Sequence, residues 1–175
     1  MSAYKDFERI TKYWLGELEK YNEEPFLAKT PYSEWSVGQV YVHLFQYLKE
    51  LVKPGIEKCL EPGFEGEKGG KTFAGVFLFT FKQFKGKATK REENLNVEPQ
   101  NPESLMEARN LMIRSLKIMA DLDDKIKKAS KEQLKKKFTH PTLGKLTARE
   151  WYLVNIFHFY HHIDQKKKID KHFMR

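Results

Sequence analysis

The sequence predicts a mainly α protein, arranged as an antiparallel four-helix bundle with a long crossover between the second and third helices. Four long segments carry apolar residues every three or four positions, which is the spacing of one face of an α-helix. Two of these segments begin with a capping box, whose side chains satisfy the free amides of a first helical turn. A chain of 175 residues can also bury a sizeable core, and we expect a single domain over residues 1–175.

The first helix is expected over residues 3–21. Its apolar stripe consists of Tyr4, Phe7, Ile10, Tyr13, Trp14 and Leu18. Asn22 and Pro25 should end this helix, because proline has no amide hydrogen to donate and its ring clashes with a preceding turn.

The second helix should begin at the capping box formed by Ser36 and Gln39 and cover residues 37–53. The dipeptide Pro54-Gly55 is then expected to break it, since neither residue favours a helix interior.

Residues 61–103 form the least regular part of the chain. The aromatic run at 73–84 is compatible with a short helix and with a buried extended segment, and its periodicity does not separate the two. The stretch 85–102 is polar and loop-like. Asn101 and Pro102 then make a suitable N-cap and first-turn pair for a third helix. The stripe of that helix consists of Leu105, Ala108, Leu111, Met112, Leu116, Met119 and Leu122.

The clearest start signal in the chain precedes the fourth helix. A brief helical turn is expected at 131–137, and the capping box formed by Thr147 and Glu150 follows it. The fourth helix should therefore cover residues 148–168.

Composition excludes several classes of protein. No stretch approaches the roughly 18 consecutive apolar residues of a membrane span, and the N-terminus lacks the layout of a signal peptide. Cys59 is the only cysteine, so no intrachain disulfide can form and a cytoplasmic location is expected. A membrane partner is therefore not expected, whereas the sequence leaves a homodimer open.

The net charge of +8 would suit nucleic-acid binding, but no recognition motif accompanies the basic residues. We interpret the lysines as solvated helix ends, where positive charge suits the helix dipole, and expect no specific nucleic-acid partner. They form two clusters, the first comprising Lys125, Lys127, Lys128, Lys131, Lys135, Lys136 and Lys137, the second Lys166, Lys167, Lys168 and Lys171.

Three of the six histidines lie within five residues, at His158, His161 and His162. On a helix His158 and His162 fall roughly 40° apart. Asn155 and Gln165 point the same general way. The helix is otherwise apolar nearly all round, so it should be buried, and buried polar groups need partners. A metal ion would satisfy several imidazoles at once, but each histidine could instead be a core residue with an ordinary hydrogen bond.

If a metal binds here, its third ligand should come from another helix. His161 is the odd member of the cluster, because three ligands from adjacent faces of one helix can hardly converge on one ion. His43 is the candidate, on the flank of the apolar stripe of the second helix. A lone histidine at such a place is more often a hydrogen-bonded boundary residue than a ligand. With one cysteine in the chain, nitrogen and oxygen atoms must hold any ion.

Two parts of the chain are similar to a known family. The run Glu34-Trp-Ser-Val-Gly-Gln-Val-Tyr-Val-His43-Leu resembles the start of the second helix in DinB/YfiT-like proteins. The run His140-Pro-Thr-Leu-Gly-Lys-Leu-Thr-Ala-Arg-Glu-Trp151, followed by His158-Phe-Tyr-His-His162-Ile-Asp-Gln165, is similar to the ending of a DinB-like subfamily of unknown function. The resemblance covers nearly the whole chain.

This resemblance implies a four-helix bundle in which His43, His158 and His162 hold one divalent ion. His161 matches a family position that is not the usual ligand, and Gln165 follows the histidine pair. His161, Gln165 and Asn155 are candidates to contact the ligand residues without binding the ion themselves. His140 is expected to be a loop residue with a structural role.

The resemblance also implies a metal-dependent enzyme that acts on a small molecule. Related families include thiol-dependent transferases and isomerases as well as proteins described as metal-dependent hydrolases, so a low-molecular-weight thiol is one expected substrate. Imidazole suits several divalent ions, with zinc or nickel expected first. No motif identifies a catalytic acid or base. A metal- or ligand-binding stress-response protein without enzymatic activity therefore stays open as the alternative.

Overall fold

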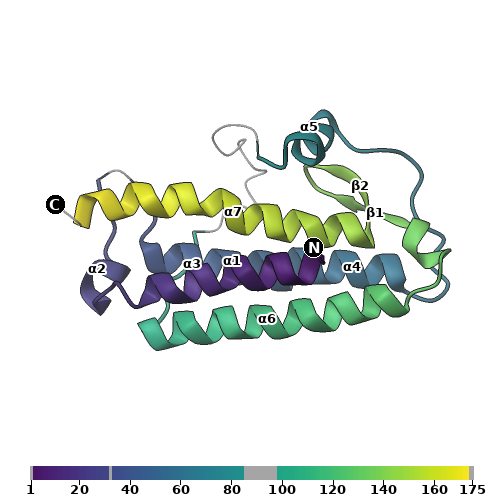
Figure 1. The fold of residues 1–175 in the computed structure, drawn as a ribbon. Helices are drawn as coiled ribbons and strands as arrows, with labels where there is room; N and C mark the ends of the chain where they lie inside the picture. Colours follow the sequence, from purple (N-terminus) through teal and green to yellow (C-terminus); the bar gives the residue numbers. More distant parts are fainter. Residues whose placement is uncertain (1, 32, 85–97, 174–175) are drawn as a thin grey trace.

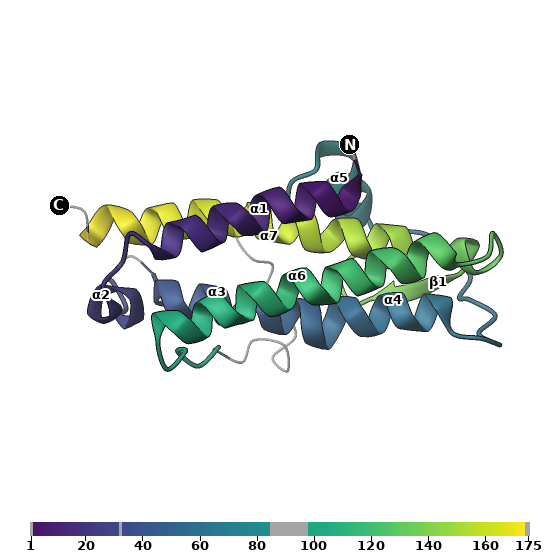
Figure 2. The same ribbon diagram turned by 60° about the horizontal axis from the view of Figure 1, so that its bottom comes forward.

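A computed structural model describes residues 2–31, 33–84 and 98–173. Most of these residues are helical, which confirms the prediction of a mainly α protein. Four long helical segments lie side by side (Figures 1 and 2). They are α1 (Ala3–Leu18), α3 (Val37–Gln46) with its continuation, α6 (Leu105–Lys128) and α7 (Ala148–Phe173).

The first and last helices are parallel neighbours. Phe7 of α1 packs on Phe159 of α7, and further along both helices Glu17 pairs with Lys166. Helix α3 and its continuation run in the opposite direction to α7, and α6 runs alongside them (Figure 1). The crossover over residues 61–104 makes this arrangement possible, because it returns the chain to the end of the molecule at which α3 began.

The second helical segment does not break at Pro54-Gly55, contrary to the expectation. Helix α3 continues into the π-helical turn η1 (Tyr47–Val52) and then into α4 (Lys53–Leu60). At the end of this wider turn the Lys53 amide donates to the carbonyl of Leu48, five residues earlier. Pro54 consequently lies in the first turn of α4, where its missing amide hydrogen matters least. The π-turn thus accommodates the proline within a continuous helix.

The end of the first helix was also predicted wrongly. Helix α1 ends at Leu18, not at residue 21. Asn22 then precedes a further short helix, α2 (Glu23–Leu27), which includes Pro25. The first amides of a helix have no partner within it, so a proline in the first turn costs no hydrogen bond.

The third helix begins later than expected. Its N-cap is Ser104, whose hydroxyl accepts a first-turn amide, and not Asn101. Asn101 instead accepts a hydrogen bond from the Ser36 hydroxyl at the start of α3. Pro102 packs so closely on Gly38 that a Cβ atom there would lie 2.8 Å from the proline ring. These two residues therefore fasten the end of the crossover to α3, and the capping role passes to Ser104.

Between α6 and α7 the chain forms a small hairpin that was not expected. The predicted helical turn is present at Gln133–Lys135. Strands β1 (Lys137–His140) and β2 (Gly144–Thr147) follow and pair antiparallel, with His140 opposite Gly144. Strands of four residues are too short for an alternating apolar pattern to stand out from a polar loop.

Helix α7 starts where the capping box predicted. The Glu150 carboxylate accepts the Thr147 amide at 2.8 Å, and the Glu150 amide donates to the Thr147 hydroxyl at 3.4 Å. The helix continues to residue 173, beyond the expected end at 168. Among the residues that the structure describes, no helix is both long and apolar enough to cross a membrane.

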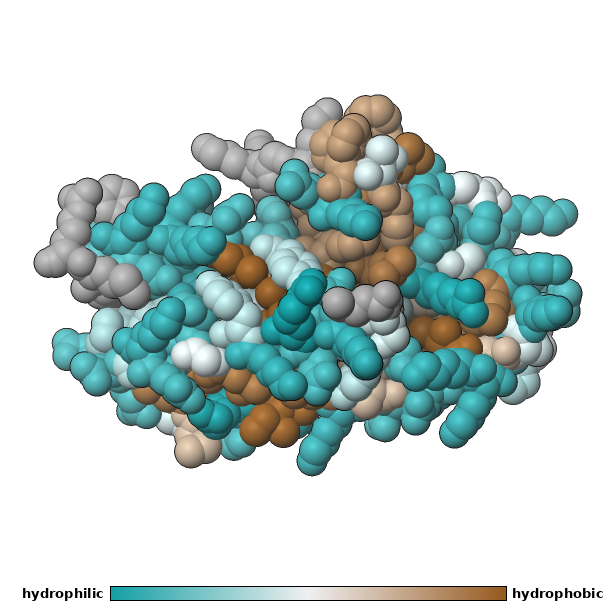
Figure 3. All heavy atoms as spheres, in the orientation of Figure 1, coloured by the Kyte–Doolittle hydropathy of each residue, from teal (hydrophilic) through white to brown (hydrophobic). Residues whose placement is uncertain are grey.

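The aromatic run of the crossover is helical, as α5 (Phe73–Phe81), while residues 85–97 of the predicted polar loop lie outside the described residues. One side of α5 rests on the hairpin, where a Cβ at Gly75 would come within 2.2 Å of the Leu143 carbonyl oxygen. The other side faces outward, with Phe73 75% and Phe81 60% exposed. It forms the apolar patch over α5 in Figure 3.

Candidate metal centre

The structure brings together the three histidines predicted as ligands. His43 comes from α3, and His158 and His162 come from successive turns of α7. The Nε2 atom of His158 lies 3.1 Å from that of His43 and 2.9 Å from that of His162. One ligand nitrogen from each residue falls within 4.8 Å of the other two. All three side chains are buried, with exposures of 9%, 5% and 7% for His43, His158 and His162.

This geometry fits a divalent ion. A tetrahedral ion with metal–nitrogen bonds of about 2.0–2.1 Å places its ligand nitrogens about 3.3 Å apart, close to the distances observed here. The alternative is a set of ordinary hydrogen bonds. A hydrogen on His158 Nε2 can serve only one of the two neighbouring nitrogens, whereas a cation accepts a lone pair from each imidazole. The donor set therefore suits a metal better than it suits a hydrogen-bonded core.

Gln165 contacts the cluster from its place on α7. Its side-chain oxygen lies 2.6 Å from Nδ1 of His162. Because a carbonyl oxygen only accepts, this nitrogen carries the proton and Nε2 of His162 keeps its lone pair. A hydrogen bond of this kind fixes the tautomer and ring orientation of a metal-binding histidine.

Aromatic rings line the histidine cluster. The Trp35 ring lies 4.9 Å from His43, and Phe84 presents its edge to His158 at 5.9 Å, measured between ring centroids. The Tyr47 ring packs against the His158 ring, with centroids 3.9 Å apart and the planes tilted by 32°. These rings place the nitrogens in apolar surroundings, which strengthens electrostatic interactions at the site.

The other predicted site residues on α7 differ from one another. His161 is exposed and packs against Phe84 at 5.3 Å, which agrees with its exclusion as a ligand. Asn155 is fully buried one turn before His158. Within the described part of the chain, neither polar atom of its amide has a hydrogen-bond partner. Among the described residues, Asn155 therefore makes no side-chain hydrogen bond to the ligands.

His140 was predicted as a loop residue, and this is wrong. It is the last residue of β1, is 4% exposed, and contacts Tyr47 of the π-turn with Nε2 3.0 Å from the phenol oxygen. Sequence reasoning also missed Tyr47. The available signal was its spacing, because a residue four positions after His43 lies on the same side of the helix.

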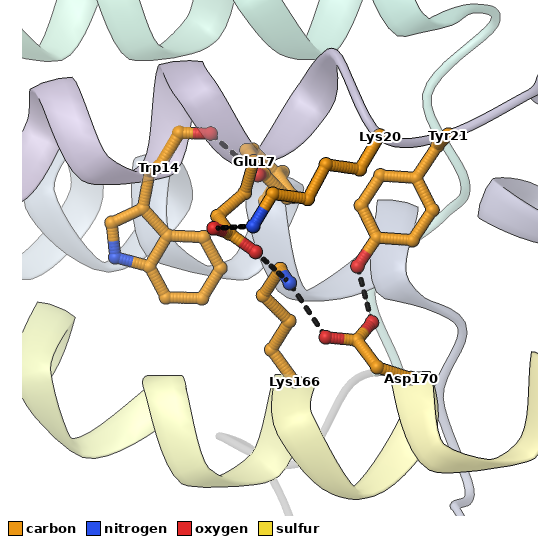
Figure 4. A network of polar contacts seen from close by, with 7 residues as sticks. Trp14, Glu17, Lys20, Tyr21, Lys166 and Asp170 are labelled. Carbon is orange, nitrogen blue, oxygen red and sulfur yellow. Dashed lines mark hydrogen bonds and ion pairs between the residues drawn. The ribbon is translucent and has the colours of Figure 1, made fainter. Parts of the chain in front are cut away.

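A second buried polar cluster on α7 contradicts the interpretation of Lys166 as solvated, whereas Lys167, Lys168 and Lys171 are exposed as expected. Lys166 is fully buried, and its Nζ lies 2.6 Å from carboxylate oxygens of both Glu17 and Asp170. Tyr21 donates a hydrogen bond to Asp170, and Lys20 pairs with Glu17 from the surface side at 2.6 Å (Figure 4). The sequence places Lys166 only 40° from His162 on the helix, so periodicity could have indicated its burial.

The single thiol takes no part in either cluster. Cys59 is fully buried in α4 and its Sγ lies 3.5 Å from the Leu146 carbonyl oxygen, to which it donates. Burial raises the pKa of this thiol to about 12, so at neutral pH it stays protonated and is not a nucleophile.

The fold and the site together define a class, a mainly helical protein in which imidazoles from two helices form a candidate metal centre. A family model described as the DinB superfamily matches residues 6–165. Because this match spans most of the chain, the protein belongs to the DinB superfamily. A comparison with curated proteins found no match.

Proposed function

We propose that this protein is a four-helix bundle that binds one divalent metal ion through His43, His158 and His162. The observation that carries the proposal is the convergence of three buried Nε2 atoms, two pairs of which lie 2.9 and 3.1 Å apart. Two different helices supply these atoms, so the arrangement depends on the tertiary fold and not on the spacing within α7 alone. Zinc and nickel are the ions that we expect first.

We further propose that the metal-loaded protein is an enzyme. Three imidazole ligands leave a divalent ion with an open coordination position, at which a water or a thiol loses its proton more readily. In the protein, Gln165 keeps the lone pair of His162 directed at the ion. Trp35, Tyr47 and Phe84 limit the access of bulk water to the three nitrogens. Transfer of a low-molecular-weight thiol and hydrolysis of a small substrate are both compatible with this site.

Two observations favour a different function. In this alternative, the protein binds a metal or another ligand in a stress response and has no catalytic activity. None of the three imidazoles is more than 9% exposed, whereas a substrate must reach the ion. Among the described residues, the cluster of possible ligand atoms contains three histidines and no carboxylate, which an enzyme could use as a general base. Activity with a panel of cellular thiols and a chromogenic acceptor, followed by ester and amide substrates, distinguishes the two functions.

The metal proposal is tested by elemental analysis of protein purified without a nickel column, because such columns load nickel adventitiously. We expect close to one ion per chain in the wild-type protein. His43→Ala, His158→Ala and His162→Ala should each lose nearly all of it, since each removes one of only three ligands. His161→Ala is the matched control, because it changes an exposed histidine of the same helix and should retain the metal.

Full metal occupancy in His158→Ala or His162→Ala would contradict the proposed site. Loss of metal in His161→Ala with retention in His43→Ala would show that the third ligand had been assigned to the wrong residue.

A further inference from the structure

The hairpin holds His140 in one defined tautomer. The amides of Thr142 and Leu143, in the turn that follows, lie 3.1 and 3.2 Å from Nδ1 of His140 and donate to it. A nitrogen that accepts hydrogen bonds carries no proton, so in the neutral ring the proton is on Nε2. The His140 Nε2–H group therefore donates to the phenol oxygen of Tyr47, at 3.0 Å.

Tyr47 connects this hydrogen bond to the candidate metal centre. Its ring packs against that of His158, with centroids 3.9 Å apart and the planes tilted by 32°, and lies 6.3 Å from the ring of His43. Tyr47 is 6% exposed and is the first residue of the π-turn. π-Turns inside helices are frequent at functional sites, where they redirect a side chain. Tyr47 thus contacts a predicted ligand with its ring face and the hairpin with its hydroxyl.

We propose that His140 and Tyr47 are positioning residues for the metal centre. His140 holds the Tyr47 hydroxyl, and the Tyr47 ring fixes the orientation of the His158 imidazole against which it packs. This inference rests on the proposed metal-binding function. It extends that function to the hairpin between α6 and α7, which supplies no ligand.

The proposal also gives a physical role to the run His140-Pro-Thr-Leu-Gly144. Gly144 has a φ of +82°, and a Cβ there would lie 2.6 Å from the Thr72 amide nitrogen. Only glycine fits a position of this kind without displacing its neighbours. Gly144 lies opposite His140 in the hairpin, so it closes the turn whose amides face Nδ1. The run therefore forms a turn that presents one imidazole to Tyr47.

The test is a titration of the metal-free protein with Co²⁺, whose visible absorption reports the geometry around the ion. We expect His140→Ala and Tyr47→Phe each to weaken binding about tenfold or more, as is typical when a group behind a metal ligand is removed. The double variant should bind no more weakly than the weaker single variant, because both changes remove the same hydrogen bond. The Co²⁺ spectrum of His140→Ala should change although His140 is not a ligand.

Two further variants complete the design. His140→Gln retains a side-chain N–H near the place of Nε2 and should recover part of the lost affinity. Thr139→Val is the matched control, because it changes the exposed neighbour of His140 on the same strand and should bind Co²⁺ as the wild type does. Each variant is titrated at a temperature at which its metal-free form keeps the helical signal. If His140→Ala does not fold, Tyr47→Phe, which removes a single oxygen atom, carries the test.

Wild-type affinity and an unchanged spectrum in His140→Ala would overturn the proposal, as would losses that simply add in the double variant. A wild-type protein that binds no Co²⁺ would instead remove the proposed function, and this inference with it. The nitrogen chemical shifts of His140 in the metal-free protein provide an independent readout. We expect the neutral tautomer with the proton on Nε2, and the opposite tautomer would also overturn the proposal.

Discussion

The interior side of α7 carries two buried polar clusters that differ in their electrostatics. In the ion cluster, formed by Glu17, Lys166 and Asp170, the buried ammonium lies 2.6 Å from a carboxylate oxygen on each side. In the histidine cluster, formed by His43, His158 and His162, like nitrogens face one another within 3.1 Å. The two clusters are only one helical turn apart, since Lys166 follows His162 by four residues.

The two clusters differ in how their buried polar groups are satisfied. The ion cluster satisfies itself, because every charge in it has an opposite charge at hydrogen-bonding distance. The histidine cluster instead brings three imidazoles together, and this donor set suits the divalent ion proposed above. Burial of polar groups therefore does not by itself identify a binding site.

The largest effect is expected from breaking the ion cluster. Lys166→Met should lower the free energy of unfolding by about 3–5 kcal/mol, because it leaves the carboxylates of Glu17 and Asp170 buried without their shared cation. Urea-induced unfolding of the metal-free protein measures this change. Lys168→Met, on the exposed side of the same helix, is the control and should stay within about 0.5 kcal/mol of the wild type. Equal stability of the two variants would mean that the buried lysine is dispensable.

Removing the metal from the histidine cluster should have a smaller effect on stability. A chelator should leave the far-UV helical signal intact, because the core of the four long helices does not depend on the ion. The melting temperature should fall, since free ion at about 100 times its dissociation constant stabilises the native state by about 2.7 kcal/mol. His162→Ala provides the control, because its melting temperature should not respond to the chelator. Collapse to a random coil would show instead that the metal is part of the core.

The smallest predicted effect is a loss of stability at low pH, which should arise in the ion cluster. Burial alone would raise the pKa of Glu17, but hydrogen bonds from Lys166 and Lys20 outweigh burial and hold it below its ordinary value. A carboxylate with a lowered native pKa stabilises the fold above the unfolded-state pKa of about 4.3. This contribution is lost as the pH falls through the lower native value.

Unfolding free energies measured from pH 7 to pH 3 test this expectation. The difference between the wild type and Glu17→Gln should shrink as the pH falls below about 4.3, because the unfolded state then binds a proton that the native carboxylate takes up only at lower pH. Glu19→Gln, which changes an exposed carboxylate two residues away, should differ from the wild type by a constant amount. A constant difference for Glu17→Gln as well would show that the Glu17 contacts do not depend on its charge.

Local signals predicted much of the fold. The capping boxes at Ser36 and Thr147 fixed two helix starts, because a cap depends only on residues three positions apart. Pro54 led to the wrong prediction of a helix break. Its effect depends on whether the preceding turn can widen, which the residues next to it do not reveal. The strands of the hairpin escaped notice because each has only four residues.

The candidate site was predictable where one helix carried the pattern, and not where the contacts span the chain. Helical geometry placed His158, His162 and Gln165 together. His43 required the family resemblance, since nothing in its own segment points to α7. The position of Lys166 on the helix could have indicated its burial, but its partner Glu17 lies 149 residues earlier and no local pattern reveals such a pair. His140 was assigned to a loop because strand β1 has only four residues, and its contact with Tyr47 was not foreseen because Tyr47 lies 93 residues before it.

The π-turn changes the direction in which the later residues of the second helical segment face. In a regular α-helix Gly55, twelve residues after His43, would be rotated about 120° away from it. Yet both residues face α7, His43 against His158 and Gly55 so close to Trp151 that a Cβ would lie 2.6 Å from the indole. One extra residue in a helical turn delays the rotation by about 100°, which nearly cancels the difference. The turn at Tyr47–Val52 therefore lets a single helix present the metal ligand and the glycine contact to the same neighbour.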